Sequence, residues 1–324
     1  MRTLISTTKA IFASLVVLTT TALAQTFPTR PVTLVVPYPP GGPTDVVARI
    51  LAERMRITFG QPVIVENVAG GSGNIGVGRV ARAAADGYTL SLGNSGSHVL
   101  NAALYTLNYD LLKDFAPVAL LTSNPQIIVT RKTLPANDLK ELVAWIAANP
   151  DKATAGSAGA VASVSIAFFQ QKTGTHLVVV PYRGAAPAVQ DLMGGQIDLM
   201  FDQASNALPQ VRAGTIKAFA VTAKARLANA PEIPTVDEAG LPALYAALWQ
   251  GLWAPKGTPQ EAITRLNAAV AEALADPKVE QRLREIGQEP FAPDQRSVAA
   301  MAAFQQAEAD KWWPIIKAAN LKGE

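Results

Sequence analysis

Hydroxyl, amide and glycine residues gather in four short loops, each of which follows a predicted strand. The loops span residues 39–44, 70–74, 93–97 and 156–159. Their glycine, serine, threonine and asparagine residues offer uncovered backbone N–H groups and neutral hydrogen-bond donors, which suit reversible capture of a carboxylate. In open parallel sheets such loops collect at the carboxyl ends of the strands, where ligands bind. Together the loops predict an anion-binding cleft, although each loop alone is also compatible with an ordinary turn.

One of these loops has the spacing of a dinucleotide-binding motif. Residues 71–76 read Gly-Ser-Gly-Asn-Ile-Gly, which matches G-x-G-x-x-G. That motif also needs an acidic residue at the end of the next strand to hold a ribose. The next predicted strand, 90–92, is followed by Gly93, Asn94 and Ser95 instead. The sequence therefore disfavours a nucleotide, while the glycines still leave N–H groups free to face an anion at a helix start.

Another loop approaches the nucleophile motif of the α/β-hydrolases. Residues 155–159 read Ala-Gly-Ser-Ala-Gly, so an alanine replaces the first glycine of G-x-S-x-G. A serine hydrolase also needs a histidine base, and the chain has only His98 and His176. His98 precedes Ser157, against the order of that fold, and His176 is predicted to lie in a surface turn. We predict that the protein is not an enzyme and keep a serine hydrolase as a remote alternative.

Amino-acid composition excludes several further classes of function. The chain has no cysteine, which excludes disulfides and thiolate metal sites, and its two isolated histidines predict neither a metal nor a cofactor. Lys and Arg number 28 against 25 Asp and Glu, with no basic cluster and few aromatic residues. This balance predicts no nucleic-acid partner.

The first 24 residues predict a cleaved signal peptide. Arg2 and Lys9 precede or flank an apolar core at 10–18, and Ala22-Leu23-Ala24 has the small-x-small pattern of a cleavage site. The alternative of an uncleaved anchor is disfavoured because the apolar stretch is too short to span a bilayer. We therefore expect a secreted, periplasmic protein that starts at Gln25.

Short β-branched runs alternate with helical patterns along the mature chain. The predicted strands are 32–36, 63–66, 90–92, 118–121, 126–130, 154–155, 177–180, 199–201 and 218–221. The predicted helices are 45–58, 75–84, 139–148, 163–173, 186–193, 259–274 and 298–319. This alternation is typical of α/β proteins with helices on both faces of a sheet.

An internal echo suggests two similar halves. Residues 36–43, Val-Pro-Tyr-Pro-Pro-Gly-Gly-Pro, recur loosely as Val-Pro-Tyr-Arg-Gly-Ala-Ala-Pro at 180–187. Each segment follows a strand and leads into a helix. Generic turn composition also explains the echo, since glycine and proline recur at turns. The sharper interpretation is two lobes, with Tyr38 in one and Tyr182 in the other.

Residues 30–45 carry a family resemblance. They read Arg-Pro-Val-Thr-Leu-Val-Val-Pro-Tyr-Pro-Pro-Gly-Gly-Pro-Thr-Asp, which resembles the N-terminal signature of the Bug family. These proteins are the periplasmic solute receptors of tripartite tricarboxylate transporters. Further segments similar to the family lie at 65–76, 181–202, 233–240 and 253–259. The resemblance covers essentially the whole mature chain.

The resemblance implies a two-lobed α/β fold of the type II periplasmic-binding class. Two mixed, mostly parallel sheets flanked by helices would be joined by two crossing strands near 122–126 and 246–252. Lobe 1 would comprise 25–122 and 250–324, and lobe 2 would comprise 123–249. A monomer of this kind would deliver a small carboxylate to inner-membrane permease subunits. A ligand-sensing component of a signalling system is the alternative role.

The family also implies a ligand site between the lobes. The ligand would be a dicarboxylate, an aromatic acid or an amino acid. The expected contacts from lobe 1 are Tyr38, Pro40, Gly41, Gly42, Pro43, Thr44, Ser72, Gly73, Ser95, Ser97 and His98. Those from lobe 2 are Ser157, Ala158, Gly159, Ser163 and Asp202.

Two charged side chains of lobe 2 keep alternative roles. In family members that take amino acids, an acid at the position of Asp202 resembles the partner of the ligand's ammonium group. Asp202 is equally suited to cap the next helix through the N–H of Ala204 or Ser205. Arg183 is expected either to clamp a second ligand carboxylate or to face solvent.

Overall fold

The computed structural model describes residues 27–182 and 184–323. The predicted signal peptide and the predicted roles of Arg183 lie outside these residues. Within the described part, no helix combines the length and the apolar character needed to cross a membrane.

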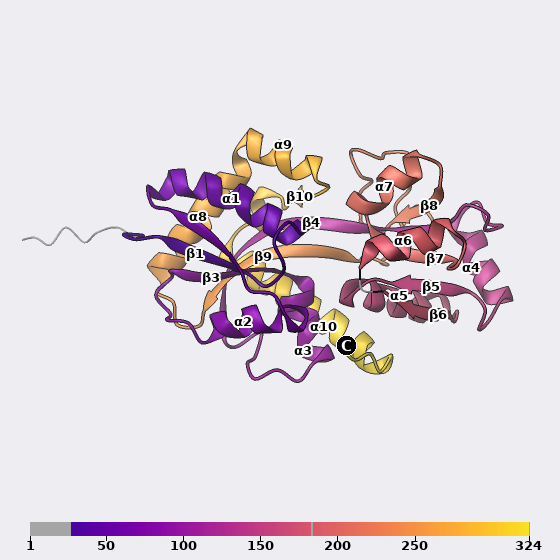
Figure 1. The fold of residues 1–324 in the computed structure, drawn as a ribbon, viewed down its shortest axis with the longest axis horizontal. Coiled ribbons are helices and arrows are strands. Elements are labelled where there is room, and N and C mark those ends of the chain that lie inside the picture. The colour runs from indigo at the N-terminus through magenta and orange to yellow at the C-terminus, as the bar shows by residue number, and fades with distance from the viewer. Residues whose placement is uncertain (1–26, 183, 324) are drawn as a thin grey trace, which may run out of the picture.

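A path of paired strands runs through the whole molecule (Figure 1). Its order is β2 (Val63–Asn67), β1 (Val32–Val36), β3 (Thr89–Asn94), β9 (Ala247–Pro255), β4 (Phe115–Arg131), β7 (Leu199–Gln203), β5 (Thr154–Ser157) and β6 (Val178–Pro181). Strands β8 (Ile216–Val221) and β10 (Glu289–Pro290) pair with β4 beside this path. The fold is therefore mixed α/β with two halves, as the resemblance implies.

Parallel and antiparallel pairs occupy different parts of this sheet system. Strand β1 is parallel to β2 and β3, and β5 is parallel to β6 and β7. The helical crossovers that parallel strands require include α1 (Pro43–Phe59), α2 (Asn74–Ala81), α5 (Ala160–Thr173) and α6 (Ala185–Met193). The pairs that β4 makes with β9, β7 and β8 are all antiparallel. The two parallel groups thus lie at opposite ends, and antiparallel strands join them.

Strand β4 is longer than its sequence predicts. The predicted strands 118–121 and 126–130 form one strand of 17 residues, Phe115–Arg131. Polar residues and Pro125 interrupt the apolar pattern between them, which is why the sequence divides the strand in two. Up to Pro125 strand β4 pairs with β9, and from Gln126 onward it pairs with β7 and β8. The proline thus lies where the strand changes partners.

Figure 1 shows β4 and β9 as the long connections between the two halves. Helices α1, α2, α8 (Gln260–Ala275) and α9 (Pro277–Glu285) surround the first half. Helices α4 (Leu139–Ala148), α5, α6 and α7 (Ala204–Arg212) surround the second half. The lobe boundaries expected from the family stay a prediction. The expected crossing segment 122–126 lies within β4, and the segment 246–252 overlaps β9.

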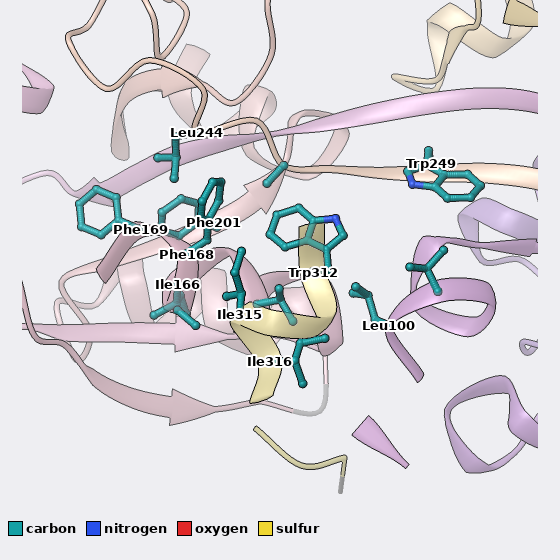
Figure 2. Packing of buried hydrophobic residues seen from close by; sticks show 14 of the residues in the cluster. Leu100, Ile166, Phe168, Phe169, Phe201, Leu244, Trp249, Trp312, Ile315 and Ile316 are labelled. Carbon is teal, nitrogen blue, oxygen red and sulfur yellow. The ribbon is translucent and has the colours of Figure 1, made fainter. Parts of the chain in front are cut away.

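Helix α10 (Val298–Ala318) packs against both halves. One hydrophobic cluster contains Leu100 from the first half, Phe168 from the second half, and Trp312 of α10 (Figure 2). The rings of Trp312 and Phe168 meet edge to face with centroids 5.4 Å apart. On the other side of α10, the Trp313 indole N–H donates to the Val99 carbonyl at 2.9 Å. The helix therefore ties the two halves together through buried contacts.

Candidate ligand-binding cleft

A cavity of about 770 Å³ lies between the two halves. Its size falls in the range of small-molecule sites, which is about 300–1,000 Å³. Polar groups reach it from both sides. The first half contributes Tyr38, Ser72, Asn94 and Asn101, and the second half contributes Ser157, Ser163, Tyr182 and Asp202.

The sheet explains why these residues meet. Asn94 is the last residue of β3, Ser157 is the last residue of β5, and Asp202 is the next to last of β7. Tyr38 and Tyr182 follow the ends of β1 and β6. Each residue thus lies at the carboxyl end of a strand, where ligand sites of α/β sheets form. Since the two tyrosines of the sequence echo face one cavity from opposite halves, the two-lobe interpretation of the echo gains support.

On the first half, the cleft wall is held by its own hydrogen bonds. The Tyr38 hydroxyl donates to Asn94 Oδ1 at 2.8 Å, and the Ser97 N–H donates to the same oxygen at 3.2 Å. Burial raises the pKa of Tyr38, so its hydroxyl keeps its proton at neutral pH. Asn94, which the sequence places in a predicted loop but not among the ligand contacts, is therefore the residue that fixes the tyrosine ring.

The loop before α1 is also tied up internally. The Asp45 carboxylate accepts hydrogen bonds from the Gly41 N–H at 2.8 Å, from Arg49 Nε at 2.9 Å and from Asn67 Nδ2 at 2.9 Å. Burial acts to raise the pKa of Asp45, but these hydrogen bonds and the charge of Arg49 hold it below its ordinary value. The Gly41 N–H is thus already engaged by an acid of the same chain.

This arrangement bears on five of the expected ligand contacts. Pro40, Gly41, Gly42, Pro43 and Thr44 do not line the cavity, although the tyrosine just before them does. The sequence could not show that Asp45 and Asn67 would form hydrogen bonds at this loop, because the two residues lie on different elements. A direct ligand contact by residues 40–44 stays a prediction without support from the cavity.

Ser72 lies in a left-handed turn at the edge of the cavity. Its φ is +54°, between glycines at +54° and +95°, so a non-glycine residue holds an unfavourable backbone conformation here. Its hydroxyl is 2.8 Å from the Tyr105 hydroxyl, and its carbonyl accepts from Asn101 Nδ2 at 3.0 Å. Gly73 is buried beside it, and a Cβ there would lie 3.2 Å from that of Ser97. Ser72 therefore faces the cavity, whereas Gly73 only allows the close packing behind it.

His98 lies in the core and not in the cleft. Its ring stacks on Trp253 with centroids 3.8 Å apart, and Nδ1 is 2.9 Å from Ser97 Oγ. Burial lowers the pKa of His98 to about 3, so the ring is neutral at physiological pH. Ser95, Ser97 and His98 are all buried and none of them lines the cavity. The structure therefore gives no support to the expected ligand contact by the His98 side chain.

The second half presents the start of helix α5 to the cavity. Ala160, Val161 and Ala162, the first three residues of this helix, line it. The first N–H groups of a helix have no partner within it, and they carry the positive end of the helix dipole. The residue before the helix is Gly159, which has no side chain to cap these N–H groups. The arrangement is suited to an anion such as a carboxylate.

Two serine hydroxyls stand beside this helix start. Ser157 Oγ lies 2.6 Å from Ser163 Oγ, and Ser163 Oγ donates to the Gly159 carbonyl at 3.2 Å. Among the described residues, no hydrogen bond joins Ser157 to a histidine. His176 also lines the cavity, and its largely exposed side chain lies 2.9 Å from Asp151. All five expected contacts of this half line the cavity, namely Ser157, Ala158, Gly159, Ser163 and Asp202.

Asp202 is the charged group buried deepest in the cavity wall. Its side chain belongs to a residue that is 4% exposed, and burial raises its pKa to about 6. Oδ1 accepts from the Gln203 N–H at 2.9 Å and from Asn206 Nδ2 at 3.3 Å. These donors differ from Ala204 and Ser205, which the capping alternative expects, and α7 has no side-chain cap at its start. Oδ2 is buried and has no hydrogen-bond partner among the described residues, although Asp202 as a residue lines the cavity.

The sequence interpretation also missed two amide side chains of the lining that lie near the change of partners along β4. Gln126 of β4 and Gln203 of β7 both line the cavity. Gln126 Nε2 donates to the Phe201 carbonyl at 3.3 Å, and Gln203 Oε1 accepts from Asn124 Nδ2 at 3.1 Å. Their position at the change of partners along β4 was the missing signal, since polar residues inside an apolar strand are unusual unless they face a cavity. In the described residues no cluster of three His, Asp or Glu side chains is placed to hold a metal.

Comparisons with known proteins converge on one family. The sequence profile described as tripartite tricarboxylate transporter family receptor matches residues 47–321. The solved structure of MatC from Rhodopseudomonas palustris with bound malate is 40% identical and covers 90% of this chain and 100% of its own, with a TM-score of 0.76. The periplasmic binding protein BugD is 38% identical over 92% of this chain and 100% of its own, with a TM-score of 0.76. Rpa4515 of R. palustris, solved with adipate, is 36% identical over 91% and 99%, with a TM-score of 0.77.

Proposed function

The chain belongs to the tripartite tricarboxylate transporter receptor (Bug) family of periplasmic solute-binding proteins, which are not enzymes, and we propose that it captures a small aliphatic dicarboxylate in its cleft. The start of helix α5 carries this proposal. It directs N–H groups into a cavity that also holds the hydroxyls of Ser157 and Ser163. A carboxylate at this point would be stabilised by the helix dipole and by neutral donors.

The other end of the ligand would meet Asp202. A second, fully ionised carboxylate would be repelled by an ionised Asp202, whereas two carboxyl groups that share a proton attract each other. The pKa of about 6 places the proton of Asp202 within reach of physiological pH. A ligand hydroxyl, as malate has, would also donate to the Asp202 carboxylate. These requirements favour a dicarboxylate that carries a hydroxyl or that shares the proton of Asp202, and they agree with the malate and adipate of the related structures.

The cellular role follows the family. The chain would be exported by the signal peptide at 1–24, act as a monomer, and pass its ligand to the membrane subunits of a transporter. Closure of one lobe upon the other about β4 and β9 would bury the ligand and create the surface that these subunits recognise.

Binding of a panel of acids to the purified mature protein tests the proposal. Isothermal titration and thermal unfolding would use malate, succinate, adipate, benzoate and glutamate. Malate or adipate should raise the unfolding midpoint with increasing concentration, since a ligand that binds only the folded state stabilises it. Binding of benzoate or glutamate alone would replace the dicarboxylate with another class, and binding of no acid would refute the proposal.

A further inference from the structure

The segment after helix α10 forms a third wall of the cavity, in addition to the two halves. Ala319, Leu321, Lys322 and Gly323 all line it. None of these residues belongs to a strand end or to a glycine-rich loop, so the sequence pattern did not place them at the site. Figure 1 shows this end of the chain between the two halves.

A tight turn directs this segment into the cavity. Asn320 has a φ of +49°, which ends the helix in a left-handed conformation. The Leu321 N–H returns to the Ile316 carbonyl at 3.0 Å, and the Gly323 N–H donates to the Leu104 carbonyl at 2.9 Å. The segment is therefore fixed at both of its ends, by α10 and by the first half.

Gly323 fits closely against Tyr105, the residue that follows helix α3 (Asn101–Leu104). A Cβ at this position would overlap the ring of Tyr105, so only glycine allows the observed approach. Tyr105 also lines the cavity, and its hydroxyl lies 2.8 Å from that of Ser72. The position of the segment is thus coupled to the first-half wall of the cleft.

The segment brings a positive charge to the cavity. Among the described residues that line it, Lys322 is the only lysine or arginine, and Asp202 is the only acid. Lys322 is exposed, whereas Asp202 is buried. A cation at the edge of a cleft attracts an approaching anion, and the attraction grows with the charge of the ligand.

We propose that the segment Asn320–Gly323 is part of the ligand site and that Lys322 selects dianionic over monoanionic ligands. The proposal rests on the proposed function, because it takes the ligand to be a carboxylate. Lys322 supplies the only lysine or arginine side chain of the described lining, which otherwise has the imidazole of His176, and Gly323 holds the segment in place against Tyr105.

Lys322→Gln tests the charge, with Lys317→Gln as the matched control. Lys317 is an exposed lysine of α10 that does not line the cavity. Adipate, a dianion, and its monoamide, a monoanion, would each be titrated at low and at high salt. The titrations would reach high ligand concentrations so that weak binding is also measured. Lys322→Gln should weaken adipate about threefold at low salt, the size expected of an exposed charge pair, and leave the monoamide nearly unchanged. The loss should vanish at high salt, and Lys317→Gln should have no effect.

A second variant tests the placement of the segment. Gly323→Val should displace the segment from Tyr105 and reproduce the loss of adipate preference, with an unchanged unfolding midpoint in the absence of ligand. Equal losses for adipate and its monoamide, a loss that persists at high salt, or unchanged binding by both variants would overturn the proposal. If the unsubstituted protein binds no dicarboxylate, the proposed function itself fails. If it binds adipate and Lys322→Gln binds it equally well, only the role of Lys322 fails.

Discussion

The two walls of the cleft differ in how their polar groups are hydrogen-bonded. On the first half, Asp45 takes up the N–H of Gly41, and Asn94 holds the Tyr38 hydroxyl. On the second half, the first three residues of α5 line the cavity, and Asp202 keeps one oxygen without a partner in the described chain. The first wall is therefore shaped by hydrogen bonds among its own side chains. The second wall offers the N–H groups at the start of α5, beside two serine hydroxyls that bond to each other.

The comparison indicates where selectivity is located. A wall whose donors and acceptors already satisfy each other changes little from one ligand to the next. Unpaired buried groups are costly in the empty site, and a ligand that satisfies them regains this energy. We therefore expect substitutions in the second half to change binding more than equivalent substitutions in the first half.

The largest expected effect comes from adding a carboxylate to each wall. Ala160→Asp places one at the start of α5, where it would occupy the position of the ligand anion. Repulsion between two unit charges about 4 Å apart costs about 4 kcal/mol at an effective dielectric constant of 20, which corresponds to roughly a thousandfold loss of affinity. Titration of the best dicarboxylate would measure it.

Gly42→Asp is the matched control on the first half. Gly42 precedes α1 with a φ of −75°, and a Cβ there meets little besides the Pro39 carbonyl oxygen at 3.6 Å. Aspartate is a good residue at this position of a helix, so the protein should fold normally and bind almost as before. A loss as large as that of Ala160→Asp would instead place the ligand carboxylate at residues 40–44.

The next effect concerns two buried aspartates with opposite pKa shifts. Burial raises the pKa of Asp202 to about 6 from an ordinary value of 3.8. The folded protein thus binds this proton more tightly than the unfolded chain, and stability is lost as the pH rises from about 4 to about 6. Asp202→Asn should therefore raise the free energy of unfolding of the ligand-free protein at pH 7.5 by about 2–3 kcal/mol, with little change at pH 4.

Asp45→Asn should do the reverse. The pKa of Asp45 is lowered in the folded protein, so its ionised form stabilises the fold above its ordinary pKa, and this contribution is lost as the pH falls below it. The substitution should lower the free energy of unfolding at pH 7.5 by about 1–3 kcal/mol. Urea unfolding of both variants at the two pH values would measure these changes. Equal signs for the two aspartates at pH 7.5 would remove the contrast between the walls.

The smallest expected effect concerns the two echoed tyrosines. Tyr38→Phe removes the hydrogen bond to Asn94, and Tyr182→Phe removes one of 2.6 Å to Asp191 Oδ2. Each should lower the free energy of unfolding by about 1 kcal/mol. Since Tyr38 acts here as a support of the first wall, affinity for the dicarboxylate should fall by less than about tenfold, which titration would show. A much larger loss would make the Tyr38 hydroxyl itself a ligand donor.

More of the contacts expected on the second half than on the first line the cavity, and the reason is physical. Ser157 through Ser163 run continuously from the end of β5 into α5, so their meeting at the cavity follows from local structure. The first wall depends on partners far apart in the chain. His98 is buried because β9 pairs with β3 and places Trp253 beside it. The residues around His98 in the sequence do not predict this contact. The turn signature at 39–44 likewise cannot show that Asp45, which is held by Asn67, accepts a hydrogen bond from the Gly41 N–H of this loop.

The order of strands has a consequence for how the chain acquires its structure. Strand β9 lies between β3 and β4, and α8 and α10 also pack against the first half, yet all three come late in the sequence. A chain that emerges from its N-terminal end therefore leaves the first half without an inner strand, the one between β3 and β4, until residues 247–255 have arrived. Strands β5 to β8 and their helices are contiguous and can assemble earlier. The half that is made first is completed last, and its apolar strands stay exposed to aggregation or to chaperones in the meantime.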